Sequence, residues 1–167
     1  MKHFQPKLSD QKHCCLGSVI EGTMRPDDLI PEFADELKKA IGNRREEENR
    51  LLVQKAESII YRLDLSYEFE NADETFEEVK EEMSELVNEL TDALNEYAPP
   101  FVRFGAHEGD GAAFGWWPDL DSLHEAISYG VKMDDERVYL PDDGLVVHIN
   151  DHGNVTLYSL TEVWSCV

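Results

Sequence analysis

The chain has 167 residues, of which 41% are hydrophobic and 10% aromatic, so it can bury the core of at least one domain. Its 36 acidic and 15 basic residues give a formal net charge of −21. That charge argues against direct binding to DNA or RNA, which depends largely on Lys and Arg, and against anionic membrane surfaces. We therefore expect basic partners, either a nucleic-acid-binding protein or cations.

The apolar runs and the cysteines indicate the cellular compartment in which the protein is expected. No run approaches the roughly 20 apolar residues that span a bilayer, and the first residues lack the apolar core of a signal peptide. Cys14 and Cys15 are adjacent, Cys166 is distant and there is no CxxC, so we expect reduced thiols rather than disulfides or structural zinc. We predict a cytoplasmic protein without a metal or another cofactor.

The first part of the chain carries helix signals. The stretch LSDQKHCCLGSVIEG, residues 8–22, predicts a short helix. The stretch RPDDLIPEFADELKKAIGN starts with Pro26 and two acids and ends with two lysines before Gly42, which favours a second helix. Apolar residues at helical spacing predict a third, amphipathic helix over about residues 44–63.

The clearest helix spans about residues 73–97, and Pro99-Pro100 ends it. Its apolar residues alternate at three- and four-residue spacing, which is the heptad seam of a helix that packs on another helix. The seam consists of Phe76, Val79, Met83, Leu86, Leu90, Ala93 and Tyr97. We expect an antiparallel hairpin with the preceding helix; a second copy of the chain, forming a homodimer, is the alternative partner for this seam.

The second half of the chain changes to strand periodicity. FVRFGA and AAFGWW predict strands joined by a glycine turn, and LVVHIN, NVTLYSL and EVWSCV predict a meander with a hairpin turn at NDHGN. A helix is predicted over about residues 119–130, capped by Asp119. The predicted fold class is α+β: a helical region, residues 1–98, and an antiparallel sheet of four or five strands with one packed helix, residues 99–167. We expect the two regions to form one compact unit.

Several blocks resemble a family of small, uncharacterised proteins of tailed phages and prophages. These blocks are GTMRPDDLIPEFADEL, APPFVRFGAHEGDGAAFGWWPDLDSL, NDHGNVTLY and EVWSCV. The resemblance implies an origin and not an activity. Small nonstructural phage proteins often act against host defences such as CRISPR effectors, restriction systems and cyclic-nucleotide signalling, so it favours an anti-defence role.

The acidic helix is the first candidate site. Residues 68–96 hold twelve acids and one base, Lys80. Carboxylates four residues apart form a row with about 6 Å of axial rise per step, which resembles nucleic acid in sign and shape, although more sparsely. Repulsion between them requires that packing along the seam hold the helix together. The candidate contact residues are Glu77, Glu78, Glu81, Glu82, Glu85 and Glu89.

The stretch FGAHEGDGAAFGWW, residues 104–117, is the second candidate site. We interpret it first as a strand–turn–strand unit, in which one tryptophan faces the core and the other the opposite side. With the later turn it could line a pocket for a nucleotide, with basic, polar and aromatic side chains. The candidate ligand-binding residues are Arg103, His107, Asp110, Trp116, Trp117, His148 and His152.

No catalytic signature is present: the chain has no P-loop, GxSxG or HExxH motif, and no catalytic residue is assigned. The leading hypothesis is therefore a non-enzymatic phage protein in the bacterial host cytoplasm. It would inhibit a host defence or nucleic-acid-handling protein by placing its acidic helix on a basic surface, as a DNA mimic does. One alternative is a binder that sequesters a cyclic nucleotide or an ADP-ribose derivative. The other is a metal-dependent enzyme that uses His107, Asp110, His148 and His152.

Overall fold

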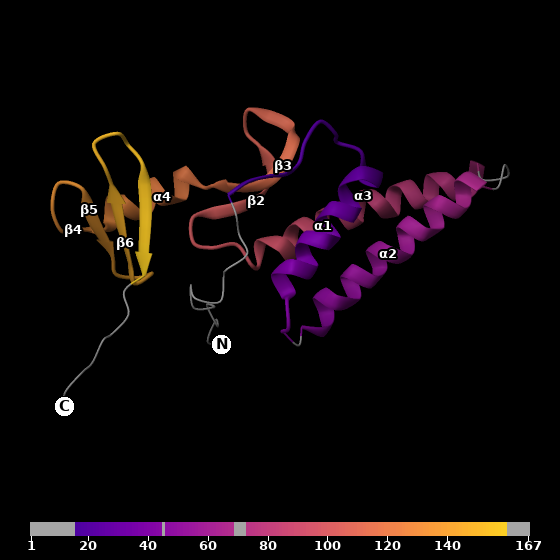
Figure 1. The fold of residues 1–167 in the computed structure, drawn as a ribbon, viewed down its shortest axis with the longest axis horizontal. Coiled ribbons are helices and arrows are strands. Elements are labelled where there is room, and N and C mark those ends of the chain that lie inside the picture. The colour runs from indigo at the N-terminus through magenta and orange to yellow at the C-terminus, as the bar shows by residue number, and fades with distance from the viewer. Residues whose placement is uncertain (1–15, 45, 69–72, 160–167) are drawn as a thin grey trace. The chain divides into compact units, whose positions relative to one another are not determined.

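The computed structural model describes residues 16–44, 46–68 and 73–159, without the side chains of residues 65–78 (Figure 1). The chain divides into two compact units, Met1–Pro118 and Asp119–Val167. The first unit thus contains a strand hairpin as well as the helices, whereas the sequence suggested a boundary near residue 98. Each unit is described by itself.

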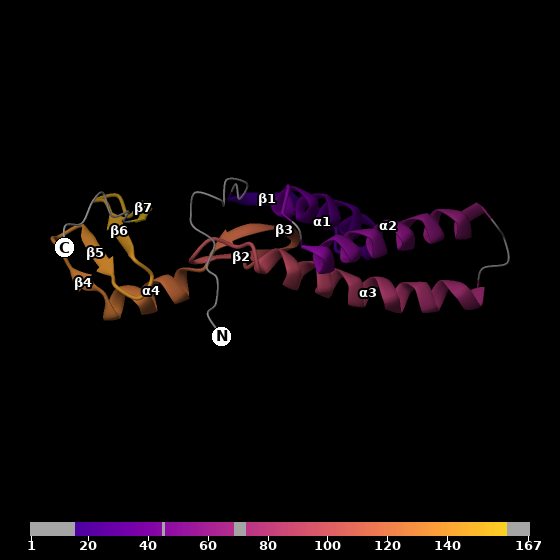
Figure 2. The same ribbon diagram turned by 90° about the horizontal axis from the view of Figure 1, so that it is seen from below.

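Three helices form most of the first unit: α1 (Pro26–Ile41), α2 (Glu47–Glu68) and α3 (Asp73–Asn95). Helices α2 and α3 lie side by side as the expected antiparallel hairpin, and α1 packs against both (Figure 2). Ile30, Phe33 and Leu37 of α1 are fully buried. The core of the unit is therefore formed within one chain.

The predicted heptad seam is confirmed over its described residues. Five of its members are buried, and the seam faces α1 and α2 of the same chain. These are Val79, Met83, Leu86, Leu90 and Ala93. The side chain of Phe76 is not described, and Tyr97 follows the helix and is half-buried.

A three-stranded antiparallel sheet completes the first unit, with β1 (Gly17–Ile20), β3 (Asp110–Pro118) and β2 (Val102–His107) in that order. The helix predicted over residues 8–22 is wrong at β1; residues 8–15 lie outside the described residues. Local helix signals are overridden here because pairing with β3 places Val19 and Ile20 against the core.

Glycine 115 makes that pairing possible. A Cβ atom at this position would overlap the carbonyl oxygen of Gly17 and lie 2.7 Å from the Cα of Ser18. The close approach of β1 to β3 therefore requires a residue without a side chain.

A buried polar contact connects α1 to β3. The indole Nε1 of Trp116 donates to Oε1 of Glu36 at 3.0 Å, and Nζ of Lys39 lies 3.1 Å from Oε2. Trp116 is 2% exposed and the Glu36 side chain is 11% exposed. Around this contact, Phe33 meets the ring of Phe104 at 4.9 Å, so α1 and the sheet share one aromatic core.

Asn95 connects α3 to β2. Its side-chain Nδ2 donates to the carbonyl oxygen of Phe104 at 3.0 Å, and its Oδ1 accepts from the Phe104 amide at 2.8 Å. One amide side chain thus satisfies both backbone groups of a residue at the outer edge of the sheet, as a neighbouring strand would.

The second unit holds α4 (Leu120–Tyr129) and a four-stranded antiparallel sheet. Asp119 caps α4 as predicted, accepting from Ser122 N at 3.0 Å. The strands, in spatial order, are β4 (Val131–Lys132), β5 (Arg137–Leu140), β6 (Leu145–Ile149) and β7 (Val155–Ser159). The turn between the last two is the predicted one, with Gly153 at φ +79°.

These observations confirm the α+β class and the C-terminal antiparallel sheet with one packed helix. The prediction that the 101–117 hairpin shares a sheet with the later strands is wrong: β2 and β3 pair with β1, and β4–β7 form a separate sheet. The expected strand EVWSCV lies outside the described residues.

We expect Gly115→Ala to lower the free energy of unfolding by about 2 kcal/mol or to detach β1, because the new methyl group overlaps the β1 backbone. Urea unfolding and amide hydrogen exchange over residues 17–20 measure these effects. The matched control is Gly111→Ala, because a Cβ at that position meets nothing within 4 Å. Equal stability of the two variants would contradict the proposed close approach.

We expect Trp116→Phe to lower the free energy of unfolding by about 2 kcal/mol, because a nearly buried carboxylate loses its indole donor. Trp117→Phe is the control; it removes a bond from Nε1 to the Gly105 carbonyl (2.9 Å) at a half-buried site and should cost less. Denaturant unfolding followed by circular dichroism compares them. A larger loss from the Trp117 substitution would refute the assigned role of the Glu36 contact.

Candidate functional site

The candidate carboxylates of α3 are not equivalent. Glu82 pairs with Arg62 (2.8 Å) and Glu89 pairs with Lys55 (2.7 Å), and both basic residues belong to α2. These two carboxylates join the helices of the hairpin. Each pair is partly exposed, so it contributes on the order of 1 kcal/mol or less.

Other carboxylates of α3 point away from the hairpin. Glu81, Glu85 and Asp92 are exposed and form no ion pair or hydrogen bond through their side chains with the described residues. We call these three residues the outward stripe. With a rise of 1.5 Å per residue, it extends about 16 Å along the helix axis. The side chains of Glu77 and Glu78 are not described.

Helix geometry explains why Asp92, and not Glu89, belongs to the outward stripe. A row at four-residue spacing turns by about 40° per step around a helix of 3.6 residues per turn. The predicted row therefore drifts from the solvent side toward α2 by the time it reaches Glu89. Asp92 lies eleven residues after Glu81, which is close to three full turns, so this spacing was the signal to use.

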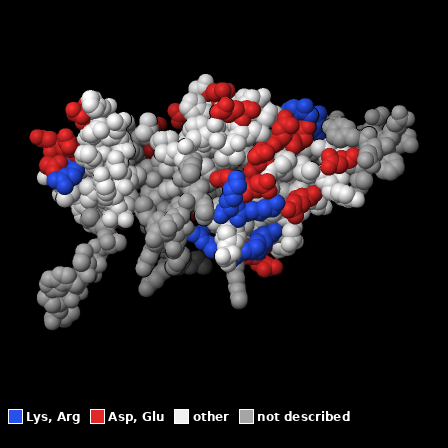
Figure 3. Space-filling view, in the orientation of Figure 1, with Lys and Arg blue, Asp and Glu red and all other residues white. Residues whose placement is uncertain are grey.

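Basic side chains moderate the acidity of α1 and α2. On the face shown in Figure 3, Lys and Arg lie among Asp and Glu over these two helices. Lys38 contacts both Asp35 and Glu57 at 2.9 Å. These hydrogen bonds, to Glu57 first and then to Asp35, raise the pKa of Lys38. Of the predicted contact residues with described side chains, Glu81 and Glu85 are exposed without a described ionic partner, whereas Glu82 and Glu89 are paired.

The glycine-rich hairpin uses its polar groups to hold its own shape. Arg103 contacts Glu108 (3.1 Å), and the His107 ring lies edge-on to Trp117 at 4.6 Å. Asp110 Oδ1 accepts from the amide of Ala112 at 3.1 Å, as in an Asx turn. The interpretation as a strand–turn–strand unit is confirmed: β2 and β3 are joined by this turn.

The two tryptophans face opposite sides of the sheet, as strand alternation predicts. Trp116 is in the core on Glu36, and Trp117 is half-buried, with its Nε1 on the carbonyl of Gly105. Neither ring is fully exposed as an anchor for a stacked base. The buried position of Trp116 could have been predicted from Glu36. An acid on the buried side of the amphipathic helix α1 needs a hydrogen-bond donor, and the Trp116 indole supplies it.

The remaining predicted ligand residues lie in the second unit. His148 Nε2 is 3.0 Å from Oε2 of Glu136, and His152 is exposed in the β6–β7 turn beside Asp151 (3.6 Å). The predicted nucleotide or metal site thus draws on residues of two separate units. Within the described residues, no group of three or more His, Cys, Asp or Glu side chains is placed to hold a metal ion.

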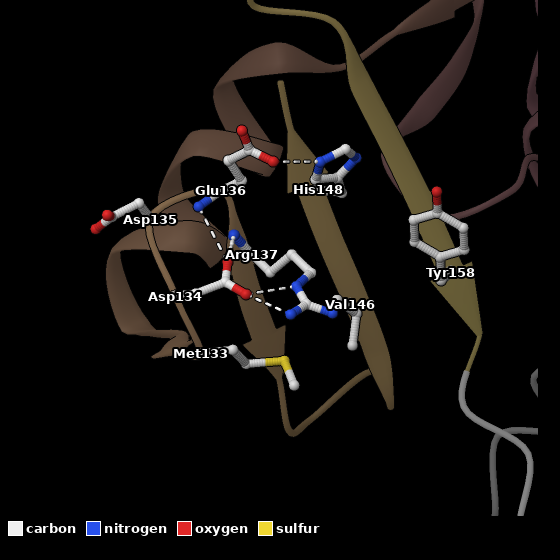
Figure 4. Close-up of a pocket in the computed structure, with 8 residues that line it drawn as sticks. All are labelled: Met133, Asp134, Asp135, Glu136, Arg137, Val146, His148 and Tyr158. Carbon is white, nitrogen blue, oxygen red and sulfur yellow. Dashed lines mark hydrogen bonds and ion pairs between the residues drawn. The ribbon is translucent and has the colours of Figure 1, made fainter. Parts of the chain in front are cut away.

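The second unit also has an open groove that the sequence did not predict (Figure 4). It has a volume of about 740 Å³ and an apolar floor with acidic residues at its edge. Its lining consists of Met133, Asp134, Asp135, Glu136, Arg137, Val146, His148 and Tyr158. Met133 and Tyr158 are 54% and 51% exposed, which is high for large apolar side chains.

Asp134 shapes the loop at the edge of the groove. Its Oδ2 accepts from Nε of Arg137 at 2.6 Å, and its Oδ1 accepts from the amides of Glu136 and Arg137. The side-chain bond to Arg137 is the main cause that lowers the pKa of Asp134. This carboxylate is therefore occupied by the loop itself.

The comparisons with known proteins add no relative: no family model, curated protein or solved structure matches the chain. Among the described residues, no helix has the length and apolar character needed to cross a bilayer.

We expect Arg137→Gln to raise the pKa of Asp134 toward its ordinary value, because the bond that stabilises the charged form is lost. Carbon-13 NMR titration of the Asp134 carboxyl measures the change. In the native chain, a lowered folded-state pKa contributes stability above the ordinary aspartate pKa, and this contribution is lost as pH falls through the folded-state value. The Arg137→Gln variant should therefore lose less stability on acidification. An unchanged Asp134 titration would contradict the assignment.

Proposed function

We propose that this chain is a non-enzymatic binding protein that docks its outward stripe on a basic, nucleic-acid-binding surface of another protein. The observation that supports this most directly is the exposure of Glu81, Glu85 and Asp92 without ionic partners among the described residues. Carboxylates that are already paired would have to break a contact before binding a partner, whereas these three do not.

The division of labour along α3 favours the same function. Glu82 and Glu89 pair with basic side chains of α2, and the buried seam packs α3 into the hydrophobic core. The outward stripe is thus carried on a rigid element, which limits the entropy lost when it binds. A preformed row of carboxylates in a basic channel excludes the phosphates that normally occupy it.

The sequence resemblance to phage proteins suggests the biological setting. A small acidic phage protein in the host cytoplasm would encounter CRISPR effectors and restriction enzymes, whose nucleic-acid channels are basic. The proposed activity is inhibition of such a host protein by occupying its channel. The chain would then bind no nucleic acid itself.

The test uses the full chain as bait in bacterial lysate, with mass spectrometry to identify what is captured and calorimetry to measure the affinity of the purified partner. We expect the triple variant Glu81→Gln, Glu85→Gln, Asp92→Asn to bind at least about tenfold more weakly, from about 0.5 kcal/mol per contact. Native binding should also weaken steeply between about 50 mM and about 500 mM NaCl, and duplex DNA should compete with it.

The matched control removes the same charge from other exposed sites of the first unit, through Glu32→Gln, Glu48→Gln and Asp64→Asn. These side chains are exposed and have no described ionic partner. This control should retain most of the native affinity. If both triple variants bind equally well, or if salt has no effect, the outward stripe is not the contact surface.

A further inference from the structure

Strand β7 forms an edge of the four-stranded sheet, and among the described residues it pairs only with β6. Its sequence, VTLYS, contains no charge and no proline, and its register with β6 is regular over five residue pairs. Natural edge strands usually carry Lys, Pro or a bulge that prevents further pairing. Strand β7 has none of these protections.

The turn before β7 determines which backbone groups face outward. The amide of Asn150 donates to the Asn154 carbonyl oxygen at 3.1 Å, and opposite residues in an antiparallel ladder alternate between bonded and non-bonded pairs. Ile149 and Val155, the next pair, are therefore non-bonded. The Ile149 amide agrees with this, because it donates away from β7 to the carbonyl of Glu136 at 2.8 Å.

The same alternation continues along β7. Every second residue directs its N–H and C=O to the outer edge, where no described residue pairs with them. These residues are Val155, Leu157 and Ser159. Thr156 and Tyr158 direct their backbone groups toward β6, and their side chains lie on the opposite face of the strand from Leu157.

The face that carries Tyr158 is also the face of the groove. Tyr158 is opposite Val146, and His148 is opposite Thr156, so these side chains share one side of the sheet. The Tyr158 and His148 rings are 6.5 Å apart, and both line the groove with Val146 (Figure 4). An unpaired strand edge beside a groove for alternate side chains is the arrangement by which sheets bind extended peptides.

The charge of the second unit identifies the class of peptide. Residues 119–167 contain ten acids and two bases, for a net charge of −8. Glu136 and Asp135 line the groove, in exposed contacts with His148 (3.0 Å) and Lys132 (3.2 Å), and the exposed Tyr158 ring offers a face to a cation. A second copy of the unit would also carry a net charge of −8 and would be repelled. Charge complementarity therefore favours a basic occupant.

We propose that β7 binds an extended, lysine- or arginine-bearing segment of a basic protein, which pairs antiparallel to β7 as an additional strand. Its basic side chains lie over Tyr158 in the groove, whose lining includes three acidic residues. The inference rests on the proposed function and names a second contact with the same basic partner. The outward donors and acceptors provide affinity, and the groove provides selectivity for a cation.

The test uses the full chain and a short capped peptide of alternating valine and lysine, with binding measured by calorimetry. In the antiparallel arrangement with lysines over the groove, valine amides point toward β7 and lysine amides point away. We expect N-methylation of the valines to weaken binding at least about tenfold, and N-methylation of the lysines to weaken it much less. Equal binding of the two methylated peptides, or tighter binding of the valine-methylated one, overturns the proposal.

Variants of β7 test the protein side of the contact. Val155→Pro removes one outward N–H without removing a bond to β6, and Val155→Thr is its matched control. We expect the proline variant to bind the peptide several-fold more weakly, the threonine variant to bind normally, and Tyr158→Thr to lose the preference for lysine over glutamate at the groove positions. Thermal melting verifies that each variant folds. No binding to the native chain, or no effect of the proline, overturns the proposal.

Other occupants of the edge give distinct results. A dimer in sedimentation equilibrium that Val155→Pro dissociates identifies a second copy as the occupant. Slow hydrogen exchange at the amides of Val155, Leu157 and Ser159 in the free monomer would show that other residues of the same chain already pair with this edge. Either result overturns the proposal.

The outward stripe separates this inference from the proposed function. If the neutral Glu81, Glu85, Asp92 variant still binds the peptide but loses the captured partner, both contacts exist independently. If the native chain does not bind the peptide, but its binding to the captured partner still requires the outward stripe, only the inference about β7 is wrong.

Discussion

The buried contact between Glu36 and Trp116 is the constraint on which the first unit depends. A carboxylate is costly to bury, and here the indole N–H and the Lys39 ammonium compensate that cost. The contact can form only when α1 lies on β3, so it selects one arrangement of the helices on the sheet. The Phe33 and Phe104 rings, 4.9 Å apart, supply the apolar burial that makes this arrangement stable.

Helix α3 carries many carboxylates at short spacing, and the repulsion between them destabilises the helix. Packing along its buried seam and two basic side chains of α2 offset this repulsion. Lys55 and Arg62 pair with Glu89 and Glu82, whereas Glu81, Glu85 and Asp92 have no ionic partner among the described residues. Carboxylates paired with α2 and exposed carboxylates without a described partner therefore lie on two different sides of the same helix.

Much of this structure could be predicted from local patterns. The seam of α3, the Asp119 cap and the β6–β7 turn were correct because each depends on residues close together in sequence. Strand β1 and the separation into two sheets were missed because they depend on a contact between Ser18 and Gly115, nearly 100 residues apart. No local pattern records that approach.

The candidate site divides in the same way. The acidic character of α3 is a property of sequence, but which of its carboxylates are free depends on where α2 lies. Among the predicted ligand residues, Arg103 contacts Glu108 within its own hairpin, and His148 contacts Glu136 within the second unit. The groove was missed because it combines a loop with three strands.

The side chain of Asn95 has a chemical consequence for the ageing of this protein. Its two bonds to Phe104 need one donor and one acceptor, which an amide supplies. Deamidation to aspartate replaces the NH₂ group by oxygen and sets a negative charge against the Phe104 carbonyl. A change of one functional group would therefore remove the donor half of this link between α3 and the sheet.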